Sequence, residues 1–208
     1  MASSRLTAWL GSCLVLVSAC GRESTAPDVP GAPTATDPTF VQSRADAPPL
    51  TSTRATFWAR RDADRVGTLY FQSTTGDPAD STELLRLTIP ARALSRLPDG
   101  SRIAKHDSVR ITITLVDPQR LVVELEPSGL RFANAHPARL ELAYDQASGD
   151  LDGNGVVDGR DQVREAGLSI WRRETANDPW KRVAGSRHGG HKKIDGVIEG
   201  FTQYAIAY

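Results

Sequence analysis

Apolar and polar residues alternate over most of the chain beyond residue 54, and this period of two restricts the fold more than any other feature. Every second residue is apolar in 109–115 (VRITITL), and 121–125 (LVVEL) continues the pattern after the turn sequence of 117–120 (DPQR). Successive side chains of a β-strand point to opposite faces, so the apolar set faces a core while the polar set faces water. The two segments therefore predict a β-hairpin.

Further strands are predicted in segments that share this alternation or that lie between turn residues: 57–60, 68–73, 85–89, 139–144, 168–172, 180–183, 193–199 and 203–207. Only 91–97 and 161–166 are predicted to form a helical turn. About eight to ten short strands are typical of an all-β domain built as a two-sheet antiparallel β-sandwich, with a flattened barrel as the alternative. We expect this domain to cover residues 54–208.

The start of the chain has the three parts of a secretory signal. Arg5 gives a basic beginning, residues 6–17 form an apolar run, and Ser18 and Ala19 are small residues before Cys20. This order predicts an export signal over residues 1–19. The apolar run is shorter than the roughly 20 residues that a transmembrane helix needs.

Residues 17–20 (VSAC) resemble the lipobox of bacterial lipoproteins. The resemblance implies that the Cys20 thiol is acylated and that the protein is held in the membrane of the cell envelope by its N-terminal lipid. An Asp after the Cys would favour the inner membrane in the enterobacterial sorting rule. Gly21 stands there instead, so the resemblance implies the outer membrane.

The two cysteines leave no disulfide in the mature protein, because Cys13 departs with the signal and Cys20 carries the lipid. Residues 20–53 are rich in Pro, Ala and Thr, with prolines at Pro27, Pro30, Pro33, Pro38, Pro48 and Pro49. A segment of this composition buries too little apolar surface to offset the entropy lost on ordering. We predict a disordered tether over 20–53.

Six segments stand in an order that resembles a known β-sandwich family: 89–94 (IPARAL), 126–132 (EPSGLRF), 137–142 (PARLEL), 168–171 (LSIW), 180–183 (WKRV) and 200–207 (GFTQYAIA). They are similar to the domain shared by zonula occludens proteins, netrin receptors and ankyrins, the ZU-five domain, in a divergent bacterial form. The resemblance covers about residues 80–208 and implies the same sandwich architecture.

Some members of that superfamily cut themselves at a His-Phe-Ser or His-Leu-Thr tripeptide, where a hydroxyl attacks the preceding carbonyl and a His takes the proton. The matching residues here are Gly200, Phe201 and Thr202. The hydroxyl is present, but Gly200 carries no base. We predict that this chain stays uncut.

One loop has the ligand spacing of a calcium site. Calcium loops of the EF-hand type place oxygen ligands at loop positions 1, 3, 5, 7, 9 and 12, with Gly at position 6. The residues at those ligand positions in 150–161 are Asp150, Asp152, Asn154, Val156 through its carbonyl, Asp158 and Asp161. Gly155 takes position 6 and Val157 the apolar position 8. Asp rather than Glu at position 12 resembles dockerin-type repeats. The prediction is a structural Ca²⁺; the alternative is an acidic, Gly-rich connection without an ion.

The four histidines give no site that we would predict to be catalytic. His188 and His191 flank two glycines, which indicates an exposed hairpin turn rather than a metal pair. His106 and His136 stand alone in the sequence and are predicted on the surface or in loops. No Gly-x-Ser-x-Gly, phosphate-binding Gly-rich loop or His-Glu-x-x-His motif is present. We predict that the protein is not an enzyme.

The charge balance excludes one class of partner. Lys and Arg number 25, as do Asp and Glu, so no excess of positive charge attracts nucleic acid. We expect a monomeric, lipid-anchored protein that presents an interaction or structural domain, with a protein or a glycan as partner. Two alternatives remain open. One is an envelope enzyme acting on glycan or peptide at an unrecognised site; the other is a carbohydrate-binding sandwich with an aromatic platform of Trp58, Trp171 or Trp180.

Overall fold

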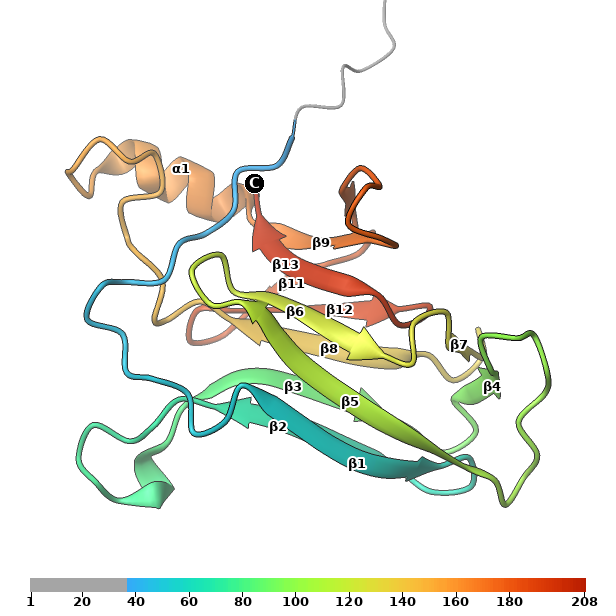
Figure 1. Ribbon diagram of the computed structural model, residues 1–208. Helices are drawn as coiled ribbons and strands as arrows, with labels where there is room; N and C mark the ends of the chain where they lie inside the picture. The colour runs from blue at the N-terminus through green and yellow to red at the C-terminus, as the bar shows by residue number, and fades with distance from the viewer. Residues whose placement is uncertain (1–36) are drawn as a thin grey trace, which may run out of the picture. The chain divides into compact units, whose positions relative to one another are not determined.

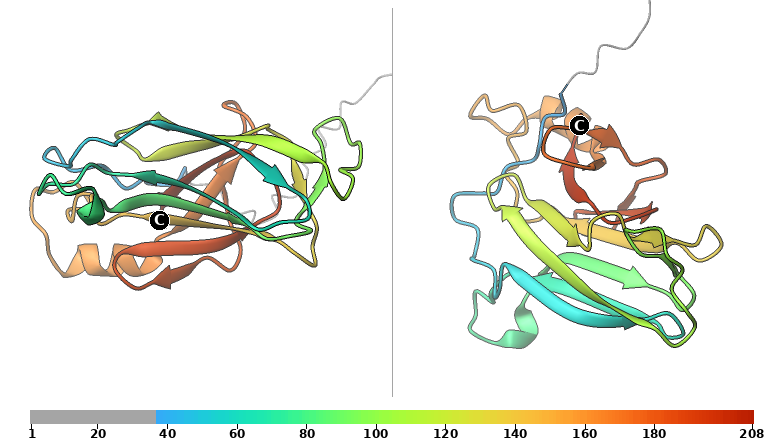
Figure 2. Two further views of the ribbon diagram at one scale, coloured as in Figure 1. Left: turned by 90° about the horizontal axis from the view of Figure 1, so that it is seen from below. Right: turned by 45° about the vertical axis from the view of Figure 1, so that its right-hand side comes forward.

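A computed structural model describes residues 37–208 as an all-β sandwich of two antiparallel sheets with one short α-helix. The predicted fold class is therefore confirmed. In Figure 1 one sheet lies in front of the other, and the left-hand view of Figure 2 shows the same two layers from below. The predicted signal over 1–19, the lipid-carrying Cys20 and the first part of the tether, 20–36, lie outside the described residues.

The first sheet has six strands and the second has five. The order in the first is β1 (Arg54–Arg60), β5 (Ser108–Asp117), β6 (Val122–Glu126), β13 (Gln203–Ala207), β9 (Ser169–Arg173) and β10 (Lys181–Arg182). The order in the second is β11 (Arg187–Gly189), β12 (Lys193–Ile198), β8 (Ala138–Ala143), β3 (Glu83–Ile89) and β2 (Arg65–Tyr70). A small third sheet pairs β4 (Leu94–Arg96) with β7 (Arg131–Phe132).

The core lies between the two large sheets and is built by the alternation seen in the sequence. Ile111 and Ile113 of β5 are fully buried, as are Leu87 of β3 and Leu140 of β8 in the second sheet, and all four belong to one hydrophobic cluster. The β5–β6 hairpin forms with Thr114 opposite Glu124 on its polar face. Each fully buried aliphatic side chain of this kind stabilises the fold by about 1.5–3 kcal/mol.

The two predicted helical turns have different outcomes. The segment 161–166 lies within the helix α1 (Gly159–Gly167), which starts earlier because Asp158 caps it. The segment 91–97 is instead a turn followed by the strand β4. A turn is closed there by the Ala93 N–H, which donates to the Pro90 carbonyl (3.0 Å), and Arg92 has a φ of 71°. A right-handed helix cannot continue through such a residue.

The segment 37–53, which composition assigns to the disordered tether, differs from the prediction. The Val41 N–H donates to the Ile206 carbonyl (3.1 Å), and Val41 itself is buried. The Ser43 N–H donates to the Gln119 carbonyl (2.8 Å). Backbone hydrogen bonds of this kind need no apolar side chain, so composition gives no signal for them. The folded unit therefore begins before residue 54.

The strands divide the sandwich into two opposite ends. Strand β5 begins at Ser108 and ends at Asp117. We call the end of the sandwich near Ser108, with the connections there, the basic end, and the end near Asp117 the acidic end. Helix α1 and the loop before it lie at the acidic end, next to the C-terminal Tyr208 (Figure 1). Within residues 37–208, no helix combines the length and the apolar character needed to cross a bilayer.

Candidate metal centre

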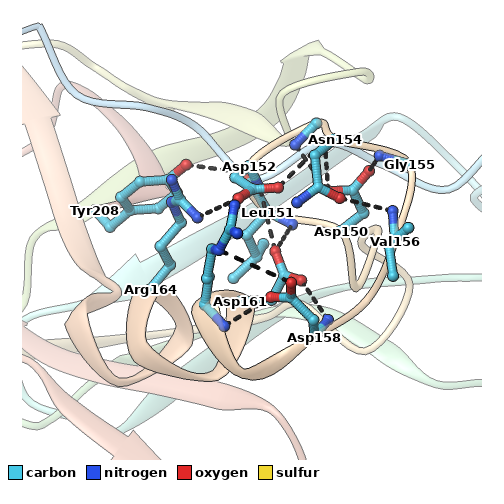
Figure 3. Close-up of polar contacts among 12 residues, drawn as sticks. Asp150, Leu151, Asp152, Asn154, Gly155, Val156, Asp158, Asp161, Arg164 and Tyr208 are labelled. Atoms are coloured by element: carbon cyan, nitrogen blue, oxygen red, sulfur yellow. Dashed lines mark hydrogen bonds and ion pairs between the residues drawn. The ribbon is translucent and has the colours of Figure 1, made fainter.

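Three aspartates of the predicted calcium loop come together at the acidic end (Figure 3). Asp150, Asp152 and Asp161 each offer one carboxylate oxygen, and these three oxygens lie within 4.8 Å of one another. Asp150 and Asp152 belong to the loop after β8, whereas Asp161 lies in the first turn of α1. The loop and the helix together thus form a group of three carboxylates.

Asp150 folds the loop around its own side chain. Its Oδ1 accepts hydrogen bonds from the N–H groups of Gly153 (2.8 Å) and Asn154 (3.1 Å), and its Oδ2 accepts one from Gly155 (2.7 Å). Gly153 and Gly155 have φ values of 71° and 88°, a region that only Gly adopts without cost. The sharp turn predicted at Gly155 is therefore present, and it needs Gly because the backbone there has a positive φ.

Asp161 joins the loop to the helix. Its Oδ1 accepts from the N–H groups of Leu151 (2.7 Å) and Asp152 (3.2 Å), while its Oδ2 accepts from the Asp158 N–H (2.8 Å). The side chain is buried, with 2 % of its surface exposed. The hydrogen bond from Asp158, followed by those from Leu151 and Asp152, holds the pKa of the Asp161 carboxyl below its usual value. Asp161 is thus an ionised, fixed ligand candidate.

The other predicted ligands have local partners. Asp158 lies outside the group of three carboxylates; it caps α1, with its Oδ1 accepting from the Arg160 N–H (2.7 Å). The Asn154 Oδ1 accepts from the Val156 N–H (2.8 Å). Val157, predicted for the apolar position 8, is 69 % exposed. The structure brings together three of the six predicted ligands, and the other three lie elsewhere in the same loop, outside this group (Figure 3).

Two residues that contact the candidate metal centre were not predicted from the sequence. Arg164 donates from Nη1 to the Asp152 Oδ2 (2.7 Å), and its guanidinium carbon lies 5.7 Å from the centroid of the Tyr208 ring. The Tyr208 hydroxyl donates to the Leu151 carbonyl (2.6 Å), as Figure 3 shows. Arg164 lies one helical turn beyond Asp161, so helical spacing is a signal for it; no local pattern places Tyr208 there.

The donor set suits a hard cation. A carboxylate oxygen has two lone pairs, and Asp150 Oδ2, Asp152 Oδ1 and Asp161 Oδ2 each accept a single hydrogen bond within residues 37–208. Calcium takes oxygen ligands at about 2.3–2.6 Å, so oxygens on opposite sides of the ion lie about 5 Å apart. The separations within this group are compatible with that distance.

The histidine hairpin has a different turn from the predicted one. We expected Gly189 and Gly190 to supply the left-handed residues, yet His191 and Lys192 have the positive φ values, 60° and 55°. His tolerates this region better than most residues. His188 and His191 are both exposed, and neither belongs to a group of metal-binding side chains within the described part of the chain.

The tripeptide 200–202 lies in a crowded part of the core. Thr202 is buried, and its hydroxyl donates to the Arg173 carbonyl. A Cβ placed on Gly200 would lie 2.7 Å from the Leu130 carbonyl oxygen, so a His at this position would require the backbone to shift. These contacts give Thr202 and Gly200 packing roles.

Trp58 lies at the opposite edge of the six-stranded sheet from the other two tryptophans. Trp58 is 60 % exposed on β1, at one edge of the six-stranded sheet, and Trp171 lies on β9 near the other edge. The Trp171 Nε1–H donates to the Ala207 carbonyl (3.0 Å). Trp180 packs edge-on against Phe40, with ring centroids 5.0 Å apart. Trp58 therefore shares no aromatic platform with Trp171 and Trp180.

A comparison with models of known protein families found no match for this chain. A comparison with curated proteins found no matching sequence either.

Proposed function

We propose that this chain is a lipid-anchored, non-enzymatic protein of the cell envelope that presents a β-sandwich stabilised by calcium. The observation that carries the calcium part is the meeting of Asp150, Asp152 and Asp161, which the EF-hand spacing assigned to loop positions 1, 3 and 12. Calcium neutralises their mutual repulsion and joins the loop to α1. The role of the ion is structural, because the three carboxylates hold backbone N–H groups of the loop and the helix cap.

The envelope part of the proposal rests on the sequence. The lipobox-like residues 17–20 follow a short apolar run, and Cys20 is the acylated residue. Millimolar free calcium is found outside the cytoplasm, where a weak loop of this kind is occupied; extracellular calcium modules bind at about 10⁻⁴ to 10⁻³ M. The two parts of the proposal therefore agree on the compartment.

Calcium binding is tested by calorimetry on the full chain. We expect binding with a Kd of about 10⁻⁴ to 10⁻³ M. A ligand specific for the folded state stabilises it by about 2.7 kcal/mol at a hundredfold excess over Kd. At millimolar calcium the excess is smaller, and we expect a rise in Tm of a few degrees. Magnesium should do much less, because it loses its water reluctantly.

The variant for this test is Asp150→Asn with Asp152→Asn, which should abolish the calcium-dependent rise. The matched control is Asp77→Asn with Asp80→Asn: it removes two carboxylates from another connection, where the Asp77 Oδ1 likewise accepts a backbone N–H (Ala79, 2.9 Å). The control should keep the full rise. No binding heat at millimolar calcium, or an equal rise in both double variants, contradicts a calcium site in this loop.

The anchor is tested by membrane fractionation. We expect the wild-type chain to partition into detergent and to carry fatty acid that is released with the N-terminal residue. Cys20→Ser should incorporate no labelled palmitate, and the mature form should no longer partition with the membrane. Equal palmitate incorporation in this variant would overturn the assignment of Cys20.

A further inference from the structure

A cavity of about 640 Å³ opens at the basic end of the sandwich. Four connections meet around it: those between β1 and β2, β3 and β4, β4 and β5, and β7 and β8. They contribute the cationic or imidazole side chains of Arg61, Arg92, Lys105 and His136. The connections that line the cavity lie at the opposite end of β5 from the loop 150–161 (Figure 1).

The carboxylates near this cavity already accept hydrogen bonds. Asp62, the only carboxylate in its lining within the described residues, accepts from Arg60 Nε (3.0 Å) and Arg60 Nη2 (2.9 Å) and contacts His106 Nδ1 (3.0 Å). The nearby Asp64 Oδ1 accepts from the Ala91 N–H (2.7 Å). Because Arg60 offsets the charge of Asp62, the lining has an excess of positive charge.

The cations of the cavity have donors to spare. Within residues 37–208, the side chains of Arg92 and Lys105 take part in no hydrogen bond or ion pair. Arg61 uses only its Nε, which donates to the Leu94 carbonyl (2.9 Å). That contact fixes the guanidinium plane and leaves both Nη groups for a ligand.

The backbone holds these residues in place before any ligand arrives. The Arg92 N–H donates to the Arg61 carbonyl (2.6 Å), and the Arg61 N–H donates to the Asp107 carbonyl (3.1 Å). The Ala133 N–H donates to the Ala93 carbonyl (2.7 Å), which joins the fourth connection to the others. A frame that is already ordered loses little entropy on binding.

Arg92 also occupies a position that suits Gly. Its φ of 71° falls at the third residue of the turn that the Ala93 N–H closes onto the Pro90 carbonyl, where a type II turn favours Gly or Asn. An Arg there is strained. Strain of this kind at a cationic cavity points to a role for the side chain in binding.

We propose that this cavity binds the phosphoryl group of a phosphomonoester. Guanidinium groups match the geometry of phosphate oxygens with paired N–H donors, and a Lys adds a point charge. The volume exceeds what a free phosphate ion fills, so the remaining space takes the group that the phosphate is attached to. The same chemistry is found on soluble phosphorylated metabolites and on lipid headgroups. The proposal is independent of calcium and of the lipid anchor.

The test is titration of the full chain, without added calcium, at constant ionic strength. The probes are inorganic phosphate, and dihexanoyl phosphatidic acid and dihexanoyl phosphatidylcholine below their micelle concentrations. We expect phosphate and phosphatidic acid to bind and phosphatidylcholine, a diester, to bind more weakly. Tighter binding of phosphatidic acid than of phosphate identifies the lipid source; similar binding of the two identifies the soluble source.

Arg92→Gly is the decisive variant, because Gly preserves the turn. Its affinity for phosphate should fall at least about tenfold, the loss expected for a charged hydrogen bond, while its Tm rises by about 2–4 °C as the strain is relieved. The matched control Arg187→Gln removes one exposed cation of β11 and should change the affinity less than about twofold. Absence of binding to phosphate and to phosphatidic acid, unchanged binding in Arg92→Gly, or an equal loss in Arg187→Gln overturns the proposal.

Discussion

The two ends of the sandwich use their charged groups in opposite ways. At the acidic end, Asp150 and Asp161 each accept three backbone hydrogen bonds, so their carboxylates hold the loop together. At the basic end, Arg92 and Lys105 have no side-chain partner within residues 37–208, and the connections are joined by backbone hydrogen bonds together with single contacts of Asp62, Asp64 and Arg61. The acidic end uses charge for structure, whereas the basic end leaves charge free for a ligand.

The largest expected effect is a loss of thermal stability when a carboxylate of the acidic end is removed, compared with the removal of one at the basic end. Asp161→Ala leaves the N–H groups of Leu151, Asp152 and Asp158 without their acceptor, and each unpaired N–H that stays buried is costly. We expect the Tm to fall by roughly 10 °C, measured by calorimetry without calcium. The control is Asp62→Ala at the basic end, whose partners are the exposed side chains of Arg60 and His106; its Tm should fall by about 1 °C or less. Equal losses in the two variants would remove the distinction between the ends.

An intermediate effect is expected at high pH. Burial, with the nearby Glu165 charge, raises the pKa of Tyr144 to about 12. Because the folded pKa lies above the ordinary value of 10, the stabilisation is fully present below pH 10 and is lost as the pH rises toward 12. By pH 11, one unit above the ordinary pKa, the loss attributable to this residue is about 1 kcal/mol.

Urea unfolding at pH 9, 10 and 11 measures this loss. Tyr144→Phe should make the decline with pH shallower, but some decline should persist, because burial also raises the pKa of Tyr204. An unchanged slope in Tyr144→Phe would show that the alkaline sensitivity does not arise at this end of the sandwich.

The smallest expected effect is a change in calcium affinity and in Tm when Arg164 of the acidic end is replaced. Arg164→Gln removes the guanidinium that contacts the Asp152 Oδ2 (2.7 Å), so calcium meets less competition and should bind several-fold more tightly. The calcium-free protein should lose about 2 °C in Tm. Arg160→Gln is the control: its side chain is 75 % exposed and 4.0 Å from Asp158, so neither value should change. Weaker calcium binding in Arg164→Gln would contradict the assigned competition.

Some features were predictable from the sequence because their causes are local. The β5–β6 hairpin follows from alternation over 109–125, and the contact of Asp150 with its own loop follows from spacing within a few residues. Gly155 was assigned its turn for the same reason. The prediction for the hairpin turn was wrong, because Gly189 and Gly190 are the residues that most readily adopt a positive φ, yet His191 and Lys192 adopt it.

The sequence by itself determined the all-β class, the β5–β6 hairpin and the acidic loop, since each depends on residues that are neighbours in the chain. Only the tertiary structure decided that Val41 is buried against the end of β13 and that Tyr208 reaches the loop at Leu151. It also decided that Arg61, Arg92, Lys105 and His136 line one cavity. Contacts between distant segments depend on which strands pair and which faces pack. Period-two alternation determines which face of the sheet a side chain lies on, but it does not determine which distant residue that side chain contacts.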